Sequence, residues 1–155
     1  MEKILSKHML DSKNSAVHVQ TFIEADITDL ANWRDNQKIK FLDVYGEKLT
    51  YTHPLIHIVS KVLRNFPILN ASLIDDKVIY KKDVNIGLAT ALQDGSLIVP
   101  VIKNADELSL AGISKSSNSL VNKARKNNLN PDDVQDGTFS ISNIGTFDNI
   151  MGTPI

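Results

Sequence analysis

Hydrophobic and polar residues alternate along this chain in two ways, and the two patterns predict different elements. Thr28 is a candidate N-cap that predicts a helix over residues 29–42, and around residues 54–66 apolar side chains recur at helical spacing, which indicates a second, clearer helix. A serine-rich stretch, 110–124, keeps the same spacing and predicts a third main helix. A short opening helix over residues 4–9 and a helical turn at Pro131 complete the predicted helices.

Segments rich in β-branched residues lie between the predicted helices and indicate strands. The pattern places these strands at residues 16–27, 70–74, 77–80, 85–92, 97–102 and 138–142. Asp75-Asp76 and Asp94-Gly95 are turn sequences, so each is expected to join two neighbouring strands into a hairpin. Pro100 lies inside one strand, which predicts an edge, a bulge or a missing ladder bond there. The order of these elements predicts a mixed α/β domain.

Composition narrows the class of protein. The chain has 155 residues, 42% of them hydrophobic, a length that fits one domain burying roughly 68–70% of its unfolded surface. A net charge of −1 argues against general nucleic-acid binding, which needs a basic excess. No apolar run approaches the ~20 residues of a membrane span, and the first residues lack a secretory signal, so we expect a soluble protein. The absence of cysteine excludes disulfides, thiol nucleophiles and cysteine-type zinc sites.

Histidines and paired carboxylates are the first candidates for chemistry. His53 and His57 stand four apart, as two metal ligands on a helix would, but a proline lies between them and no third ligand is evident. We therefore expect a helix start with a surface histidine, and no metal site. His18 lies within a predicted strand, where a core or interface histidine is favoured over a catalytic base. Asp132-Asp133 directly follows a proline, which favours a helix N-terminus over an acid–base pair.

The closing strand carries a row of hydroxyl groups. Because strand side chains alternate, Thr138, Ser140 and Ser142 point to one face, and Phe139 and Ile141 point to the other. A strand that simply faces solvent produces the same alternation. The pattern alone therefore leaves open whether these hydroxyl groups do chemistry or lie at the surface.

Several blocks, spread in order from about residue 3 to the last residue, carry a resemblance to a known family. They include "HVQTFIEADITDL", "LRNFPILNASL", "GSLIVPVIKNADELSLAGI" and "NPDDVQDGTFSISNIGTF". The chain resembles the catalytic core of the dihydrolipoamide acyltransferases of 2-oxo-acid dehydrogenase complexes, which share a fold with chloramphenicol acetyltransferase. The resemblance implies a two-layer α/β domain over 1–155, with helices packed on a mixed β-sheet.

The resemblance also implies that the domain is incomplete at its C-terminus, and that the family's lipoyl and subunit-binding domains are absent. We accordingly expect the final strand to lack neighbours and to present an open edge, which is an aggregation hazard. Ser117 stands where the family usually has an apolar residue, so we expect a looser helix there.

The reaction implied by the resemblance is transfer of an acyl group from a dihydrolipoamide thioester to coenzyme A. In the family a serine preceding Asn-Ile-Gly stabilises the oxyanion, and here that residue is Ser142. A histidine acts as general base in a later Asp-His-Arg motif. None of the four histidines has that context, so the 155-residue chain is expected to be inactive by itself. No metal is implied, and acetyl or branched-chain acyl groups are favoured over succinyl.

Substrate contacts and partners also come from the resemblance. Val99, Pro100 and Val101 are candidate walls of the substrate channel, with ordinary sheet core as the equal alternative, and Asn143 is a further candidate for substrate binding. The implied partners are two further copies in a homotrimer that builds a larger cage, lipoyl domains, and the decarboxylase and dihydrolipoamide dehydrogenase components. Neither nucleic acid nor a membrane is expected, and the implied location is the bacterial cytoplasm or the mitochondrial matrix.

Two other functions stay open. The chain could belong to a non-catalytic scaffold, because the family core also assembles into cages. A chloramphenicol-type O-acetyltransferase, which uses acetyl coenzyme A against a small hydroxyl acceptor, is the less favoured alternative.

Overall fold

A computed structural model describes residues 2–92, 95–145 and 148–153, and it divides the chain into two units. The larger unit is Thr28–Asn143, and the smaller one joins Met1–Ile27 with Ile144–Ile155. The smaller unit contains helix α1 (Glu2–Ser15), which is longer than the short opening helix that the pattern predicted.

Three helices of the larger unit lie where the sequence predicted them. They are α2 (Thr28–Tyr45), α3 (Thr52–Asn65) and α4 (Leu110–Arg125), and two short 3-10 helices, η1 (Pro67–Asn70) and η2 (Pro131–Val134), accompany them. Among the described residues of α2, however, only Phe41 is buried. Gly46, with a φ of +68°, ends α2, and its N–H donates to Leu42 O at 2.8 Å. Ser109 caps α4, where its side chain accepts a hydrogen bond from Gly112 N.

The first predicted hairpin is confirmed. Strands β1 (Ala71–Ile74) and β2 (Lys77–Tyr80) pair antiparallel, with Ile74 opposite Lys77. The two turn residues Asp75 and Asp76 have φ values of +47° and +61°, the left-handed conformation that a tight two-residue hairpin turn requires.

The second hairpin is confirmed as well, with the interruption that Pro100 predicts. Its strands are β3 (Ile86–Leu88) and β4 (Thr90–Ala91) on one side, and β5 (Leu97–Ile98) and β6 (Val101–Ile102) on the other. Proline has no N–H to give to a ladder, yet its carbonyl still accepts from Leu88 N at 2.8 Å. Gly95, with a φ of +81°, lies in the turn, whereas Asp94 lies outside the described residues.

Strand β7 (Phe139–Ile141) completes a three-stranded sheet in the order β6-β3-β7. It pairs parallel with β3, whereas β6 pairs antiparallel with it, so the sheet is mixed as expected. The expectation that the closing strand would lack neighbours is wrong, because β3 lies along one side of it. On its other side β7 is the edge of the sheet.

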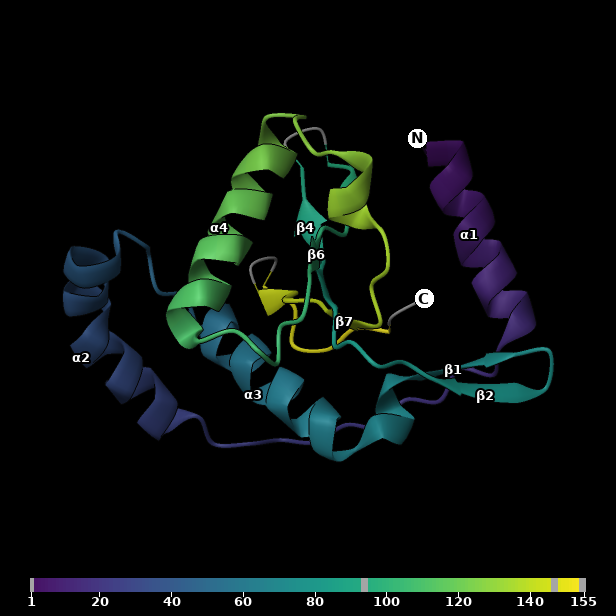
Figure 1. The fold of residues 1–155 in the computed structure, drawn as a ribbon, viewed down its shortest axis with the longest axis horizontal. Coiled ribbons are helices and arrows are strands. Elements are labelled where there is room, and N and C mark those ends of the chain that lie inside the picture. The colour runs from purple at the N-terminus through teal and green to yellow at the C-terminus, as the bar shows by residue number, and fades with distance from the viewer. Residues whose placement is uncertain (1, 93–94, 146–147, 154–155) are drawn as a thin grey trace. The chain divides into compact units, whose positions relative to one another are not determined.

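The hydrophobic core lies between this sheet and helices α3 and α4 (Figure 1). The helices and the sheet contribute residues that are almost completely buried, among them Ile56, Leu63, Ile86, Ile102, Ile113 and Leu120. Phe139 and Ile141 of β7 pack against the same cluster. Helices therefore cover one face of the sheet, which is the predicted two-layer arrangement.

Residues 16–27 were predicted as a strand, and that prediction is wrong. The segment forms no strand in the described structure, and its apolar side chains are exposed, with Val17 at 91% and Ile23 at 89%. β-branched residues favour an extended backbone, but a strand also needs a partner that supplies ladder bonds. Among the residues that the structure describes, no helix has the length and apolar character needed to cross a membrane.

Candidate active site

Ser142 directly follows strand β7, just after the last hydrogen bond of its ladder with β3. Ala89 N donates to Ile141 O at 3.0 Å, one step beyond the pair of Leu88 and Ile141. This register places Ser142 abreast of Ala89. Because side chains alternate, Ser142 points away from the face on which Ile141 meets the core. Ser142 is exposed, and its hydroxyl has no hydrogen-bond partner among the described residues.

Val99 lies beside Ala89 on the side opposite Ser142, in the segment between β5 and β6. The hairpin keeps one register throughout, with Gly87 opposite Val101 and Thr90 opposite Ile98, so Val99 lies opposite Ala89. A Cβ atom on Gly87 would lie only 2.8 Å from Val99 Cγ1. Glycine in this strand thus allows the Val99 side chain to lie against the backbone.

The predicted channel residues differ in their exposure. Val99 is half-buried, Val101 is 5% exposed, and Pro100 is completely buried. Val101 shares its face with Val99, whereas alternation turns Pro100 towards the other face. Of the three, only Val99 offers much surface within the described chain.

Asn143 connects the loop after β7 to helix α3. Its Nδ2 donates to Thr52 Oγ1 at 3.4 Å, and Thr52 is the first residue of α3. Nothing in the local sequence signals this contact, because the two residues are 91 positions apart.

The hydroxyl row of β7 is not uniform. Thr138 Oγ1 accepts from Asn85 N at 3.0 Å and donates to Asn85 O at 3.2 Å, so this hydroxyl is fully used within the fold. Ser140 Oγ would lie 3.1 Å from a Cβ on Gly87, so Ser140 lies over the central strand. Ser140 and Ser142 are therefore both exposed and free of hydrogen-bond partners among the described residues, and of the two only Ser142 directly precedes Asn-Ile-Gly.

His53 is buried, and the expectation of a surface histidine at this position is wrong. It is only 2% exposed, and its Nδ1 accepts hydrogen bonds from Thr50 N at 3.3 Å and from Ser114 Oγ at 3.0 Å. Desolvation by burial lowers the pKa of His53 to about 4, although the charge of Glu47 opposes this shift. His53 is thus neutral near pH 7 and acts as an acceptor within the core.

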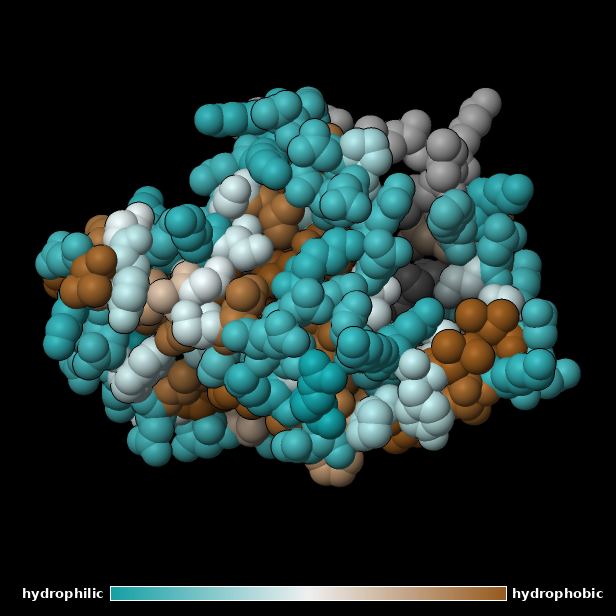
Figure 2. All heavy atoms as spheres, viewed as in Figure 1, coloured by the Kyte–Doolittle hydropathy of each residue, from teal (hydrophilic) through white to brown (hydrophobic). Residues whose placement is uncertain are grey.

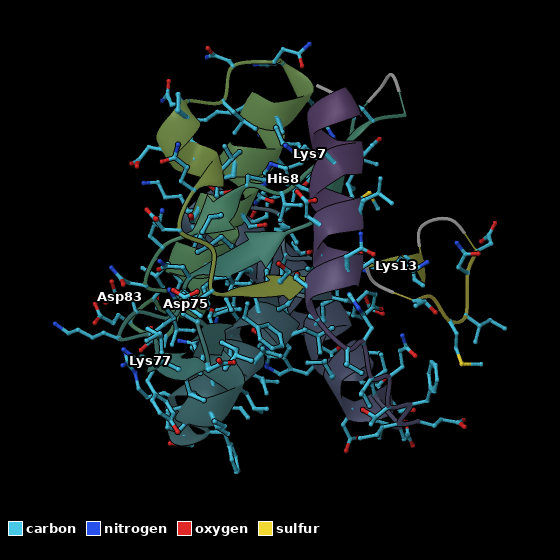
Figure 3. The ribbon with its side chains drawn as sticks, turned by 90° about the vertical axis from the view of Figure 1, so that its right-hand side faces the viewer. Lys7, His8, Lys13, Asp75, Lys77 and Asp83 are labelled. Atoms are coloured by element: carbon cyan, nitrogen blue, oxygen red, sulfur yellow. The ribbon has the colours of Figure 1, made fainter. Side chains whose placement is uncertain are left out.

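The other three histidines form no hydrogen bond with Ser142 in the described structure. His18 is exposed, with its Nδ1 3.1 Å from Ala16 O, so it is not a core histidine of this chain, and the interface alternative stays a prediction. His8 lies exposed on helix α1 (Figure 3). His57 is half-buried, and its Nδ1 has no partner among the described residues. Across the residues that the structure describes, no group of three or more histidine, aspartate or glutamate side chains is placed to hold a metal ion.

The Asp132-Asp133 pair has the capping role that the sequence favoured. Asp133 Oδ2 accepts from Asn130 N at 2.9 Å at the start of η2, and Lys123 Nζ donates to the same carboxylate. The Asn130 N–H and then the Lys123 ammonium lower the pKa of Asp133. This carboxylate is therefore bound within the fold and is not free for acid–base chemistry.

Comparison with curated proteins gives close relatives. The lipoamide acyltransferase component of the branched-chain alpha-keto acid dehydrogenase complex of Bacillus subtilis is 38% identical over 155 residues, which is 100% of this chain and 36% of the relative. The dihydrolipoyllysine-residue succinyltransferase component of the 2-oxoglutarate dehydrogenase complex of the same organism is 37% identical over 151 residues, which is 97% of this chain and 36% of the relative. The chain thus spans about a third of the length of these proteins.

Solved structures show the same fold. A probable dihydrolipoamide acetyltransferase from Listeria monocytogenes superposes with a TM-score of 0.95 at 38% identity, covering 99% of this chain and 65% of that one. The cubic core of a pyruvate dehydrogenase multienzyme complex gives a TM-score of 0.89 at 36% identity, covering 98% of this chain and 61% of that one. The sequence matches the family described as 2-oxoacid dehydrogenases acyltransferase (catalytic domain) over residues 1–155. This match, these relatives and the shared fold show that the chain belongs to the 2-oxoacid dehydrogenase acyltransferase family and forms part of its catalytic domain.

Proposed function

We propose that the protein containing this chain transfers an acyl group from a dihydrolipoamide thioester to coenzyme A within a 2-oxo-acid dehydrogenase complex. The observation that carries this proposal is the Ser142 hydroxyl. It occupies the family's serine position before Asn-Ile-Gly, it is exposed, and no described residue binds it. A hydroxyl in that state can donate its hydrogen bond to a substrate.

In the proposed reaction the sulfur of coenzyme A loses its proton to a histidine and attacks the thioester carbonyl carbon. A new carbon–sulfur bond forms, and the carbonyl electron pair moves onto oxygen. Ser142 donates a hydrogen bond to this oxyanion, which stabilises the tetrahedral intermediate more than the substrate. When the intermediate collapses, the bond to the lipoyl sulfur breaks, and that sulfur leaves with the electron pair and takes up a proton.

The general base of this reaction comes from a part of the protein beyond the residues described here. His53 is buried and held neutral, and no histidine in the described chain bonds to Ser142. Supplying the base from another segment or subunit agrees with the family's Asp-His-Arg motif, which this sequence lacks.

The proposed substrate-binding surface beside Ser142 consists of Val99, Pro100, Val101 and Asn143. Val99 would contact substrate directly, since it is half-buried and lies across Ala89 from the serine. The buried Val101 would support it on the same face of the strand, and the buried Pro100 from the opposite face. Asn143 would hold the loop through its bond to Thr52.

For the acyl group we propose acetyl or branched-chain acyl over succinyl, on the strength of the Ser-Asn-Ile-Gly loop at residues 142–145. The reaction would take place in the bacterial cytoplasm or the mitochondrial matrix. The proposed partners are two further copies in a trimer that builds a cage, lipoyl domains, and the decarboxylase and dihydrolipoamide dehydrogenase components. The relatives described above are components of such complexes, which supports this membership.

A non-catalytic scaffold is the second candidate function. The observation that favours it is that none of the chain's histidines has the environment of the family's base. A chloramphenicol-type O-acetyltransferase is the third candidate, although the match over all 155 residues disfavours it.

Turnover measurements with the full-length protein separate these functions. We expect acyl transfer between acetyl-dihydrolipoamide or isobutyryl-dihydrolipoamide and coenzyme A, and a slower reaction with succinyl-dihydrolipoamide. Acetyl coenzyme A with chloramphenicol should give no product. Turnover with chloramphenicol alone would overturn the proposal in favour of the O-acetyltransferase, and no turnover with any pair would favour the scaffold.

A further inference from the structure

Asn85 lies directly before strand β3, is 6% exposed, and forms hydrogen bonds through both the nitrogen and the oxygen of its side-chain amide. Its Nδ2 donates to Asp136 O at 2.8 Å, and its Oδ1 accepts from Asn104 N at 2.9 Å. Asp136 and Asn104 both have positive φ values, +59° and +47°. The Asn85 side chain therefore ties together two turns that adopt a costly backbone conformation.

Thr138 binds the main chain of the same residue. Its hydroxyl accepts from Asn85 N and donates to Asn85 O, while the N–H groups of Thr138 and Phe139 also donate to Asn85 O at 2.8 and 3.2 Å. The beginning of β7 is therefore attached to Asn85 by both main-chain and side-chain bonds. We call this pair, Asn85 and Thr138, the register clamp.

The clamp is needed because the strand sequence does not define its own register. Residues 138–142 read Thr-Phe-Ser-Ile-Ser, so a slip of two residues along β3 would keep a hydroxyl on one face and an apolar side chain on the other. Such a slip would move Ser142 by about 7 Å. Only three residue pairs join β7 to β3, so the ladder alone offers few bonds against the slip.

We propose that Asn85 and Thr138 are positioning residues, which set the register of β7 and thereby place the Ser142 hydroxyl for oxyanion stabilisation. The proposal rests on the acyl transfer proposed above. Thr138 lies four residues from Ser142, about 13 Å along an extended strand, so it acts through the strand and does not touch the reacting atoms. A displacement of about 1 Å at a catalytic group can cost about a hundredfold in rate.

The test is a double-mutant cycle in the full-length protein. Thr138→Val keeps the size and branching of the side chain but removes the hydroxyl, and Thr138→Ser restores it. We expect Thr138→Val to lower kcat by about ten- to a hundredfold with less than a twofold change in KM for coenzyme A, and Thr138→Ser to recover kcat to within about threefold of wild type. In a Ser142→Ala background, Thr138→Val should lower kcat by less than about twofold further, because the group that it positions is already gone.

A merely structural role predicts a different result. If Thr138→Val lowers kcat by the same factor with and without Ser142, or raises KM while kcat stays unchanged, the positioning proposal is wrong. Should Thr138→Val fail to fold, Asn85→Asp takes its place, since it keeps the acceptor for Asn104 N and removes the donor to Asp136 O. The same cycle with Ser142→Ala then decides.

Hydrogen exchange separates failure of the clamp from failure of the proposed function. The Ala89 N–H donates to Ile141 O at the far end of β7, so its exchange should be faster in Thr138→Val and normal in Thr138→Ser. Unchanged exchange in Thr138→Val overturns the clamp even if Ser142 is essential. Full activity of Ser142→Ala, in contrast, overturns the assignment of Ser142 and with it the positioning role, whatever the exchange shows.

Discussion

At the scale of single residues, the same hydroxyl chemistry serves different purposes along one strand. Thr138 is bound to Asn85, whereas Ser142 is exposed and unbound among the described residues. Alternation along the sequence correctly predicted that Phe139 and Ile141 share the core-facing side of β7, opposite the hydroxyl-bearing residues. It could not predict the different environments of Thr138 and Ser142, because Asn85 is 53 positions away from Thr138.

His53 gives a prediction about stability and pH. Burial lowers its pKa from 6.5 to about 4 in the folded protein, so the unfolded chain binds more protons between these values. The free energy of unfolding should therefore fall as the pH drops from about 6.5 to about 4, by on the order of 1–3 kcal/mol from this residue. Urea unfolding of the chain at several pH values measures the slope.

His53→Gln is the matched variant, because it keeps an acceptor and removes the titrating group. We expect its unfolding free energy to depend less on pH in this window than that of the wild type. His8→Gln, at an exposed position of α1, should keep the wild-type slope. An undiminished slope in His53→Gln would show that burial of this imidazole is not the cause.

Gly87 gives a second prediction at this scale. A methyl group there would lie 2.8 Å from Val99 Cγ1 and 3.1 Å from Ser140 Oγ, so Gly87→Ala should destabilise the protein by about 1–3 kcal/mol through overpacking. Gly112→Ala is the control, because its new methyl would lie 3.5 Å from the nearest atoms, in ordinary contact. It should stabilise helix α4 by about 0.4–1 kcal/mol. Denaturant unfolding measures both changes. If both variants were more stable than the wild type, the close packing over β3 would be contradicted.

At the scale of elements, local signals explain what could be predicted. Asp75-Asp76 and Gly95 mark turns by their backbone preferences, and Pro100 marks a gap in the ladder, so both hairpins were predictable. The parallel pairing of β7 with β3 was not, because it joins residues about fifty positions apart and depends on the clamp at Asn85. Residues 16–27 have high strand propensity, but they form no strand because no neighbouring strand supplies ladder hydrogen bonds in the described structure.

Helix α4 allows a prediction about its buried serines. Ser114 and Ser117 are 0% and 2% exposed, and Ser114 Oγ is bonded to His53 Nδ1, whereas Ser117 Oγ has no bond within the described residues. Ser117→Ala should therefore stabilise the chain slightly, since alanine is the better helix former. Ser114→Ala should be less stable than Ser117→Ala by about 1 kcal/mol, the value of one hydrogen bond.

Thermal and urea unfolding of the two variants measure this difference. The expectation that Ser117 loosens the helix would be supported by the gain in Ser117→Ala. Equal stabilities of the two variants would mean that the bond between Ser114 and His53 contributes nothing net.

At the scale of the whole molecule, the larger unit leaves apolar side chains exposed. Some of these side chains lie on helix α2, at the left of Figure 2. The exposed apolar residues of this helix include Trp33, Ile39, Leu42, Val44 and Tyr45. Exposed apolar surface of this kind is typical of a protein that assembles with partners. It is compatible with the proposed trimer, whose existence neither the periodicity nor the composition of one chain could predict.

Sedimentation of the full-length protein tests the assembly. We expect the mass of a trimer or of a multiple of trimers over a wide range of concentrations, and loss of activity when dilution dissociates it, because the proposed base is supplied from outside the described chain. A strictly monomeric protein with full activity would refute the proposed assembly.

The central claim is that Ser142 stabilises the oxyanion of acyl transfer to coenzyme A, and the kcat of Ser142→Ala tests it most directly. In the full-length protein this change should lower kcat by about 10²–10³-fold and leave KM for coenzyme A nearly unchanged, because the hydroxyl meets a charge that exists only near the transition state. Ser140→Ala is the matched control, on the same face but about 7 Å along the strand, and it should keep kcat within about twofold. Equally small losses in both variants would contradict the claim.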